Sequence, residues 1–86
     1  SPQPAALARM LAERDLKIDE AVRLARLASA SRDDIHTNDA LAWTLFKAGD
    51  LEGARAASLR ARRTGTKDPL ILGHAAAIDA AYVRSR

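Results

Sequence analysis

Two histidines and two short acidic pairs are the residues of this 86-residue sequence best suited to chemistry. His36 and His74 could bind a metal with Asp39, but a metal site needs three or four convergent ligands. The chain has no cysteine, no glycine-rich phosphate loop and no HExxH motif. The pairs Asp19-Glu20 and Asp33-Asp34 are better placed to add negative charge at helix starts. We therefore expect no metal, no cofactor and no enzymatic activity.

A basic segment is the strongest charge feature. The segment contains five cations and one acid, Glu52, so its local charge is +4 in a chain of net charge +3. Such a segment could meet phosphates, but no aromatic residues interleave with the cations for base stacking. We expect a solvated convex face, and nucleic-acid binding by the helix Arg55–Lys67 is the alternative function. The cations are Arg55, Arg60, Arg62, Arg63 and Lys67.

The composition favours helices packed at short distance. Hydrophobic residues make up 48% of the chain, and alanine alone occupies twenty positions. Alanine has the highest helix propensity and the smallest apolar side chain. Aromatic residues are limited to Trp43, Phe46 and Tyr82. The sequence therefore predicts an all-α fold and a single domain over residues 1–86.

No stretch of the sequence approaches the roughly 20 apolar residues of a membrane span. The N-terminal residues also lack a basic segment followed by an apolar core, the pattern of a secretory signal. We therefore expect a soluble, cytoplasmic protein that does not contact a membrane. A secretory signal that has been cleaved is the alternative.

Apolar spacing predicts five helices, at roughly 4–14, 18–30, 37–48, 51–61 and 69–83. Thr37 or Asn38 is the expected N-cap of the third helix, and Gly49 is expected to end it. Asp50 is expected to cap the fourth helix. Asp68 before Pro69 is the clearest start signal, because proline at the first helical position has no amide to leave unpaired.

The helices repeat with a fixed period. Leu7-Ala8-x-x-Leu11 recurs as Leu41-Ala42-x-x-Leu45, 34 residues later, and Ala75-Ala76 lies 34 residues further on. In the second helix of each pair, two alanines stand seven residues apart, at 21 and 28 and at 54 and 61. A helix–turn–helix repeat of this length resembles the tetratricopeptide repeat (TPR).

The resemblance implies TPR-like helical hairpins, with five antiparallel helices in a right-handed α-α superhelix. Repeat 1 would cover about 1–34, repeat 2 about 35–68, and a capping helix about 69–84. In the capping helix, the apolar stripe expected to cover the second hairpin is Ile71, Leu72, Ala75, Ala76 and Ile78.

The family also implies a concave groove, lined by the first helix of each pair, that holds a peptide or helix of another protein. Trp43 is the residue we expect to dominate binding, because a tryptophan offers a large rigid face and an indole donor. In the alternative, Trp43 and Phe46 only fill space between hairpins. The predicted groove residues are Arg9, Glu13, His36, Asp39, Trp43, Phe46, Lys47 and His74.

The sequence thus predicts a non-catalytic protein-interaction module whose partner is another protein or peptide. Two and a half repeats are few, because each hairpin of such an array is stabilised mainly by its neighbours. Self-association and membership of a longer repeat array are therefore further expectations.

Overall fold

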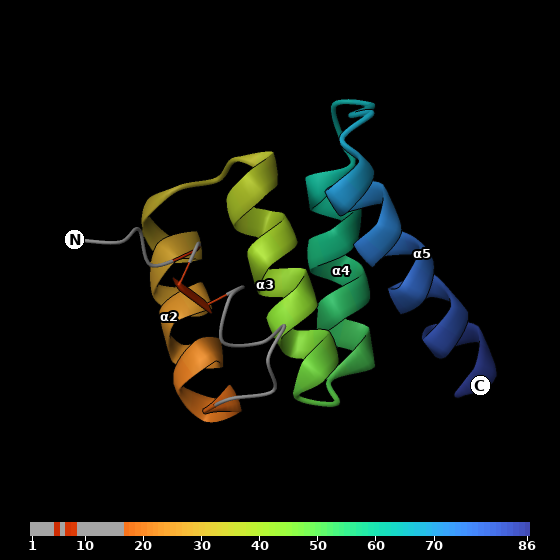
Figure 1. The fold of residues 1–86 in the computed structure, drawn as a ribbon, viewed down its shortest axis with the longest axis horizontal. Helices are drawn as coiled ribbons and strands as arrows, with labels where there is room; N and C mark the ends of the chain where they lie inside the picture. The colour runs from red at the N-terminus through yellow and green to blue at the C-terminus, as the bar shows by residue number, and fades with distance from the viewer. Residues whose placement is uncertain (1–4, 6, 9–16) are drawn as a thin grey trace.

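The computed structural model describes residues 5, 7, 8 and 17–86, and these contain four helices and no strand (Figure 1). The helices are α2 (Ile18–Ser31), α3 (Ile35–Lys47), α4 (Leu51–Ala61) and α5 (Pro69–Arg84). For these residues, the predicted all-α fold is confirmed. The expected helix over 4–14 lies mostly outside the described residues, although Ala5, Leu7 and Ala8 are helical.

The four helices lie side by side in chain order, and short connections reverse the direction from one to the next (Figure 1). α3 packs between α2 and α4, and α5 packs on α4 with a smaller contact to α3. Of these four helices, none is long and apolar enough to cross a membrane. The order of contacts makes α3 the central helix of this part of the chain.

The start of α3 differs from the prediction. Its N-cap is Asp34, whose carboxylate accepts a hydrogen bond from the backbone N–H of Thr37 at 2.7 Å. The prediction of Thr37 or Asn38 was wrong because the helix begins earlier, at Ile35, and buries both of those side chains inside the fold. The cap also holds the pKa of Asp34 below its usual value, because the Thr37 N–H bonds the ionised carboxylate.

The caps of the next two helices are as predicted. Gly49 has φ of 91°, a left-handed conformation that costs glycine little, and Asp50 accepts from the backbone N–H of Gly53 at 2.9 Å. Asp68 accepts from the N–H of Leu70 at 2.9 Å, with Pro69 at the first helical position. These two junctions fix the directions of α4 and α5.

The core is built largely from small residues. The predicted alanines at 21, 28, 54 and 61 are all buried. Small side chains at these positions let helix axes approach to the low end of the roughly 8–10 Å range. The main buried cluster is Ala8, Ala25, Leu41, Ala42, Leu45, Ala54, Ala57 and Ile78.

The buried stripe of α5 differs in part from the prediction. Ile71, Ala75 and Ile78 are buried as expected, but Leu72 is 43% exposed and Ala76 is exposed, so those two assignments were wrong. Residues 71, 74, 75 and 78 follow the helical spacing of three and four, which places His74 on the inner side. Leu72 and Ala76 consequently lie on the outer side of the helix.

Candidate functional site

Five of the predicted groove residues lie together, and we call them the Trp43 cluster: Asp39, Trp43, Phe46, Lys47 and His74. The first four share one side of α3, because helical positions separated by three, four, seven or eight residues fall on one face. His74 comes from the inner side of α5. The cluster therefore joins the central helix to the last helix.

Stacked rings form the centre of the cluster. The indole of Trp43 lies 3.9 Å from the imidazole of His74, centroid to centroid, with an interplanar angle of 12°. The ring of Phe46 lies 5.1 Å from the indole at an angle of 30°. Aromatic pairs of this kind contribute about 0.5–1.5 kcal/mol each beyond the area they bury. Both contacts restrict the rotamer of Trp43.

A buried polar pair fixes the position of His74. Its Nδ1 lies 3.0 Å and 3.2 Å from the two carboxylate oxygens of Asp39. The two residues are only 7% and 1% exposed. Because a carboxylate accepts, Nδ1 carries the proton and donates, which sets the orientation of the imidazole against the indole. Asp39 thus positions the ring on which Trp43 stacks.

The outer part of the cluster reaches the surface. Trp43, Phe46 and Lys47 are each half-buried, and the Lys47 ammonium lies 5.5 Å from the centroid of the Trp43 ring. Both aromatic rings also pack against the core, as expected in the alternative in which Trp43 and Phe46 fill space between hairpins. The Trp43 indole nitrogen is buried without a hydrogen-bond acceptor among the residues described. The rings therefore combine a packed side with a partly exposed side.

The other predicted groove residues do not extend the cluster. His36 is exposed in the first turn of α3 and, within the described part of the chain, makes no ring contact or hydrogen bond with the Trp43 cluster. Arg9 and Glu13 lie outside the described residues. In residues 5, 7, 8 and 17–86, no three His, Cys, Asp or Glu side chains are grouped to hold a metal ion.

The basic segment is partly engaged within the protein. The Arg62 guanidinium lies 3.1 Å from the Asp79 carboxylate on α5, and that of Arg55 lies 4.8 Å from the centroid of the Tyr82 ring. The Asp79 carboxylate offsets the charge that Arg62 could offer to phosphates, whereas the Tyr82 ring leaves the charge of Arg55 in place. Nucleic-acid binding by this segment stays the alternative prediction.

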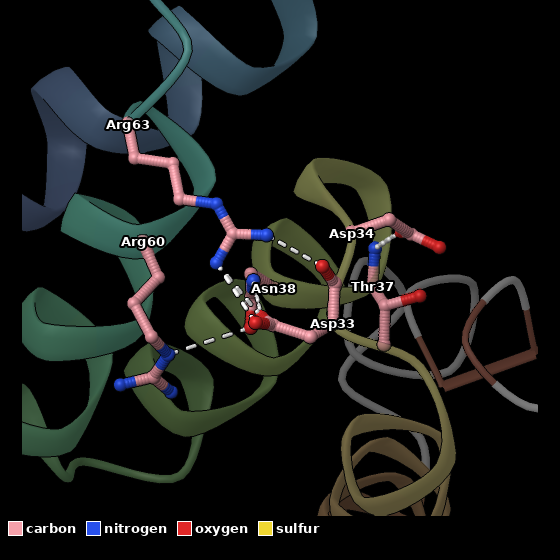
Figure 2. Close-up of polar contacts among 6 residues, drawn as sticks. All are labelled: Asp33, Asp34, Thr37, Asn38, Arg60 and Arg63. Carbon is pink, nitrogen blue, oxygen red and sulfur yellow. Dashed lines mark hydrogen bonds and ion pairs between the residues drawn. The ribbon is translucent and has the colours of Figure 1, made fainter.

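A second polar network joins the α2–α3 connection to the end of α4 (Figure 2). Arg63 Nη1 donates to both carboxylate oxygens of Asp33 at 3.0 Å, and the Asn38 side-chain amide donates to the same carboxylate at 2.9 Å. Arg60 Nε lies 3.5 Å from the side-chain oxygen Oδ1 of Asn38. The hydrogen bond from Asn38, followed by that from Arg63, holds the pKa of Asp33 below its usual value.

This network was not predicted, because Asp33 and Arg63 are 30 residues apart and neither belongs to a recognisable motif. The sequence assigned Asp33 only to the charge at the start of the third helix. The polar contacts between the α2–α3 connection and the end of α4 follow from the packing of α3 against α4. We interpret the network as a structural link between the α2–α3 connection and the end of α4.

Comparisons of the chain with protein-family models, curated proteins and solved structures find no match. The likeness to TPR proteins therefore rests on the 34-residue spacing and on the consecutive helical hairpins. What the chain does has to be argued from the geometry of its own residues.

Proposed function

We propose that this chain is a non-catalytic protein-interaction module of TPR type, in which the Trp43 cluster contacts a peptide or helix of a partner protein. The observation that carries the proposal is the half-buried Trp43, stacked on a histidine that a buried carboxylate positions. Tryptophan is among the residues most enriched at the energetic centres of interfaces.

Rigidity of the rings supports a binding role. Immobilising a flexible side chain on binding costs about 0.5–1.5 kcal/mol. Trp43 contacts both His74 and Phe46 before any partner arrives, so most of this cost has already been met on folding. A partner that covers the exposed side of the rings would then gain contact area at little entropic cost.

The expected partner segment carries a large apolar side chain. Trp43 and Phe46 offer adjoining aromatic surface, and an aliphatic or aromatic group lying across both would bury it. A peptide or a single helix has the right dimensions for a surface supplied mainly by α3.

The repeat spacing also supports the TPR assignment. Ala8 and Ala42 occupy equivalent positions 34 residues apart, and both are buried. On this assignment, α2 is the second helix of repeat 1, α3 and α4 form repeat 2, and α5 is the capping helix. The partner would contact the first-helix side of the array.

Selection from a displayed library of random peptides against the 86-residue chain tests the proposal, with affinities measured by calorimetry. Trp43→Phe keeps an aromatic ring in the stack and should weaken the selected peptides by about tenfold, or 1.4 kcal/mol. The matched control is Leu27→Ala, which removes an exposed apolar side chain from α2 and should leave affinity unchanged.

Equal affinity of Trp43→Phe and the wild type would show that the selected peptides bind elsewhere and would contradict the proposal. Nanomolar binding of duplex DNA or RNA at physiological salt would favour the basic helix instead, since non-specific binding is of order 10⁻⁴–10⁻⁶ M.

A further inference from the structure

The outer side of α5 is apolar and exposed. Leu72 and Val83 are 43% and 71% exposed, and Gly73, Ala76 and Ala80 are also exposed. These five residues lie within about 100° of arc, since successive residues are about 100° apart around a helix. We call them the α5 outer face. Asp79 is the one charged residue between Leu72 and Val83, and it lies at the edge of this face.

Equivalent positions in the preceding repeat are buried. Residues 38, 39 and 42 of α3 precede Leu72, Gly73 and Ala76 by 34 positions, and each is 1% exposed. In α3 that side is covered by the rest of the fold. On α5 the same side carries apolar residues that no described helix covers, as the position of α5 at the end of the row shows (Figure 1).

We propose that two copies of this chain associate through their α5 outer faces, with the helices antiparallel and a two-fold axis passing beside Ala76. This inference is independent of the function proposed for the Trp43 cluster. The face is complementary to itself about that axis, as a two-fold interface requires.

Large residues meet small ones in this arrangement. The axis at position 76 places Leu72 of one copy level with Ala80 of the other, four residues on either side of Ala76. It also places Val83 level with Pro69, seven residues on either side. Leucine and valine then pack beside small or compact residues, which lets two helices approach closely.

The charges at the helix ends favour the antiparallel direction. The two-fold axis brings Arg84 of one copy level with Asp68 of the other, at both ends of the interface. A parallel pair would instead align Arg84 with Arg84. Asp79 lies at the edge of the face, where Arg62 of the same chain already pairs with it. Antiparallel helix dipoles add to the preference.

The expected dimer is weak. α5 has 16 residues and is therefore about 24 Å long. One helix side per copy buries less than about 1,200 Å² in total, the range of transient interfaces. We expect a dissociation constant in the micromolar range and a reversible monomer–dimer equilibrium.

Sedimentation equilibrium of the 86-residue chain from about 1 to 500 µM tests the proposal. The wild type should shift from monomer to dimer. Ala76→Glu places two carboxylates together at the axis and should raise the dissociation constant at least about tenfold. Ala56→Glu, at an exposed position of α4, is the control of equal charge and should behave as wild type. A wild type that stays monomeric, or a dimer that Ala76→Glu leaves intact, overturns the proposal.

Disulfide trapping tests the orientation and does not depend on the charged variant. Because the chain has no cysteine, a mixture of Leu72→Cys and Ala80→Cys proteins can form only defined products. The antiparallel dimer brings these positions within the roughly 4.4–6.8 Å between α-carbons that a disulfide requires, so the mixed product should dominate under mild oxidation. Dominance of the Leu72→Cys homodimer would overturn the arrangement.

Discussion

Replacing Trp43 by alanine should destabilise the fold as well as remove the exposed part of the indole. Truncating a fully buried tryptophan costs about 3–5 kcal/mol. Trp43 is half-buried, which lowers this figure, but the substitution also removes the contacts with His74 and Phe46. We therefore expect a loss of about 2–4 kcal/mol in the free energy of unfolding.

A loss of that size is large for this chain. At 0.05–0.15 kcal/mol per residue, 86 residues correspond to a total stability of about 4–13 kcal/mol. The variant should therefore retain helical circular dichroism in buffer but unfold at a clearly lower urea concentration. This is also why Trp43→Phe is the better variant for binding, because alanine would mix a loss of contact with a loss of stability.

Urea unfolding followed by circular dichroism at 222 nm measures the effect, at a protein concentration low enough to keep the chain monomeric. Leu27→Ala removes a side chain that is 56% exposed and should cost less than about 1 kcal/mol. If Trp43→Ala costs no more than this control, the indole does not pack as described and the argument for a preorganised ring is refuted.

Two other predictions concern the residues around this site and the start of α3. His74→Ala should weaken the near-ultraviolet circular dichroism of Trp43, because it removes the ring stacked 3.9 Å away; an unchanged spectrum would contradict the stack. The lowered pKa values of Asp33 and Asp34 mean that their stabilising effect is fully present above the unfolded value near 3.9 and is lost as pH falls through the folded values. Asp34→Asn should keep the cap but reduce the loss of stability at acidic pH. Asp34→Ala should lower the free energy of unfolding by about 1 kcal/mol in urea at neutral pH. An equal loss of stability at acidic pH in wild type and Asp34→Asn would contradict the lowered pKa of Asp34.

Local signals predicted the helix junctions where a single residue type decides the conformation. Asp50 after Gly49, and Asp68 before Pro69, act within one turn of the backbone and were read correctly. The start of α3 was misplaced because Thr37 is also a good N-cap residue. The choice in favour of Asp34 depends on burial of the first turn, which is a tertiary effect.

Side-chain partners were harder to predict than helices. Spacing placed Asp39 and Trp43 on one side of the third helix, but only the packing of α5 against α3 shows that His74 lies between them. The outer position of Leu72 was missed for a similar reason. In a helix rich in apolar residues, periodicity alone does not show which stripe is buried. In α5, the buried stripe is the one that includes the polar residue His74.

The central claim, that the Trp43 cluster contacts a partner, is tested most directly by a ¹H–¹⁵N correlation spectrum recorded during titration with a selected peptide. Trp43 is the only tryptophan of the chain, so its indole N–H gives a single assigned signal. We predict that the peptide shifts this signal together with the amides of Phe46 and Lys47, while the amides of Leu72 and Val83 remain in place. Shifts confined to the segment 55–67 or to the α5 outer face, with an unmoved indole signal, would contradict the claim.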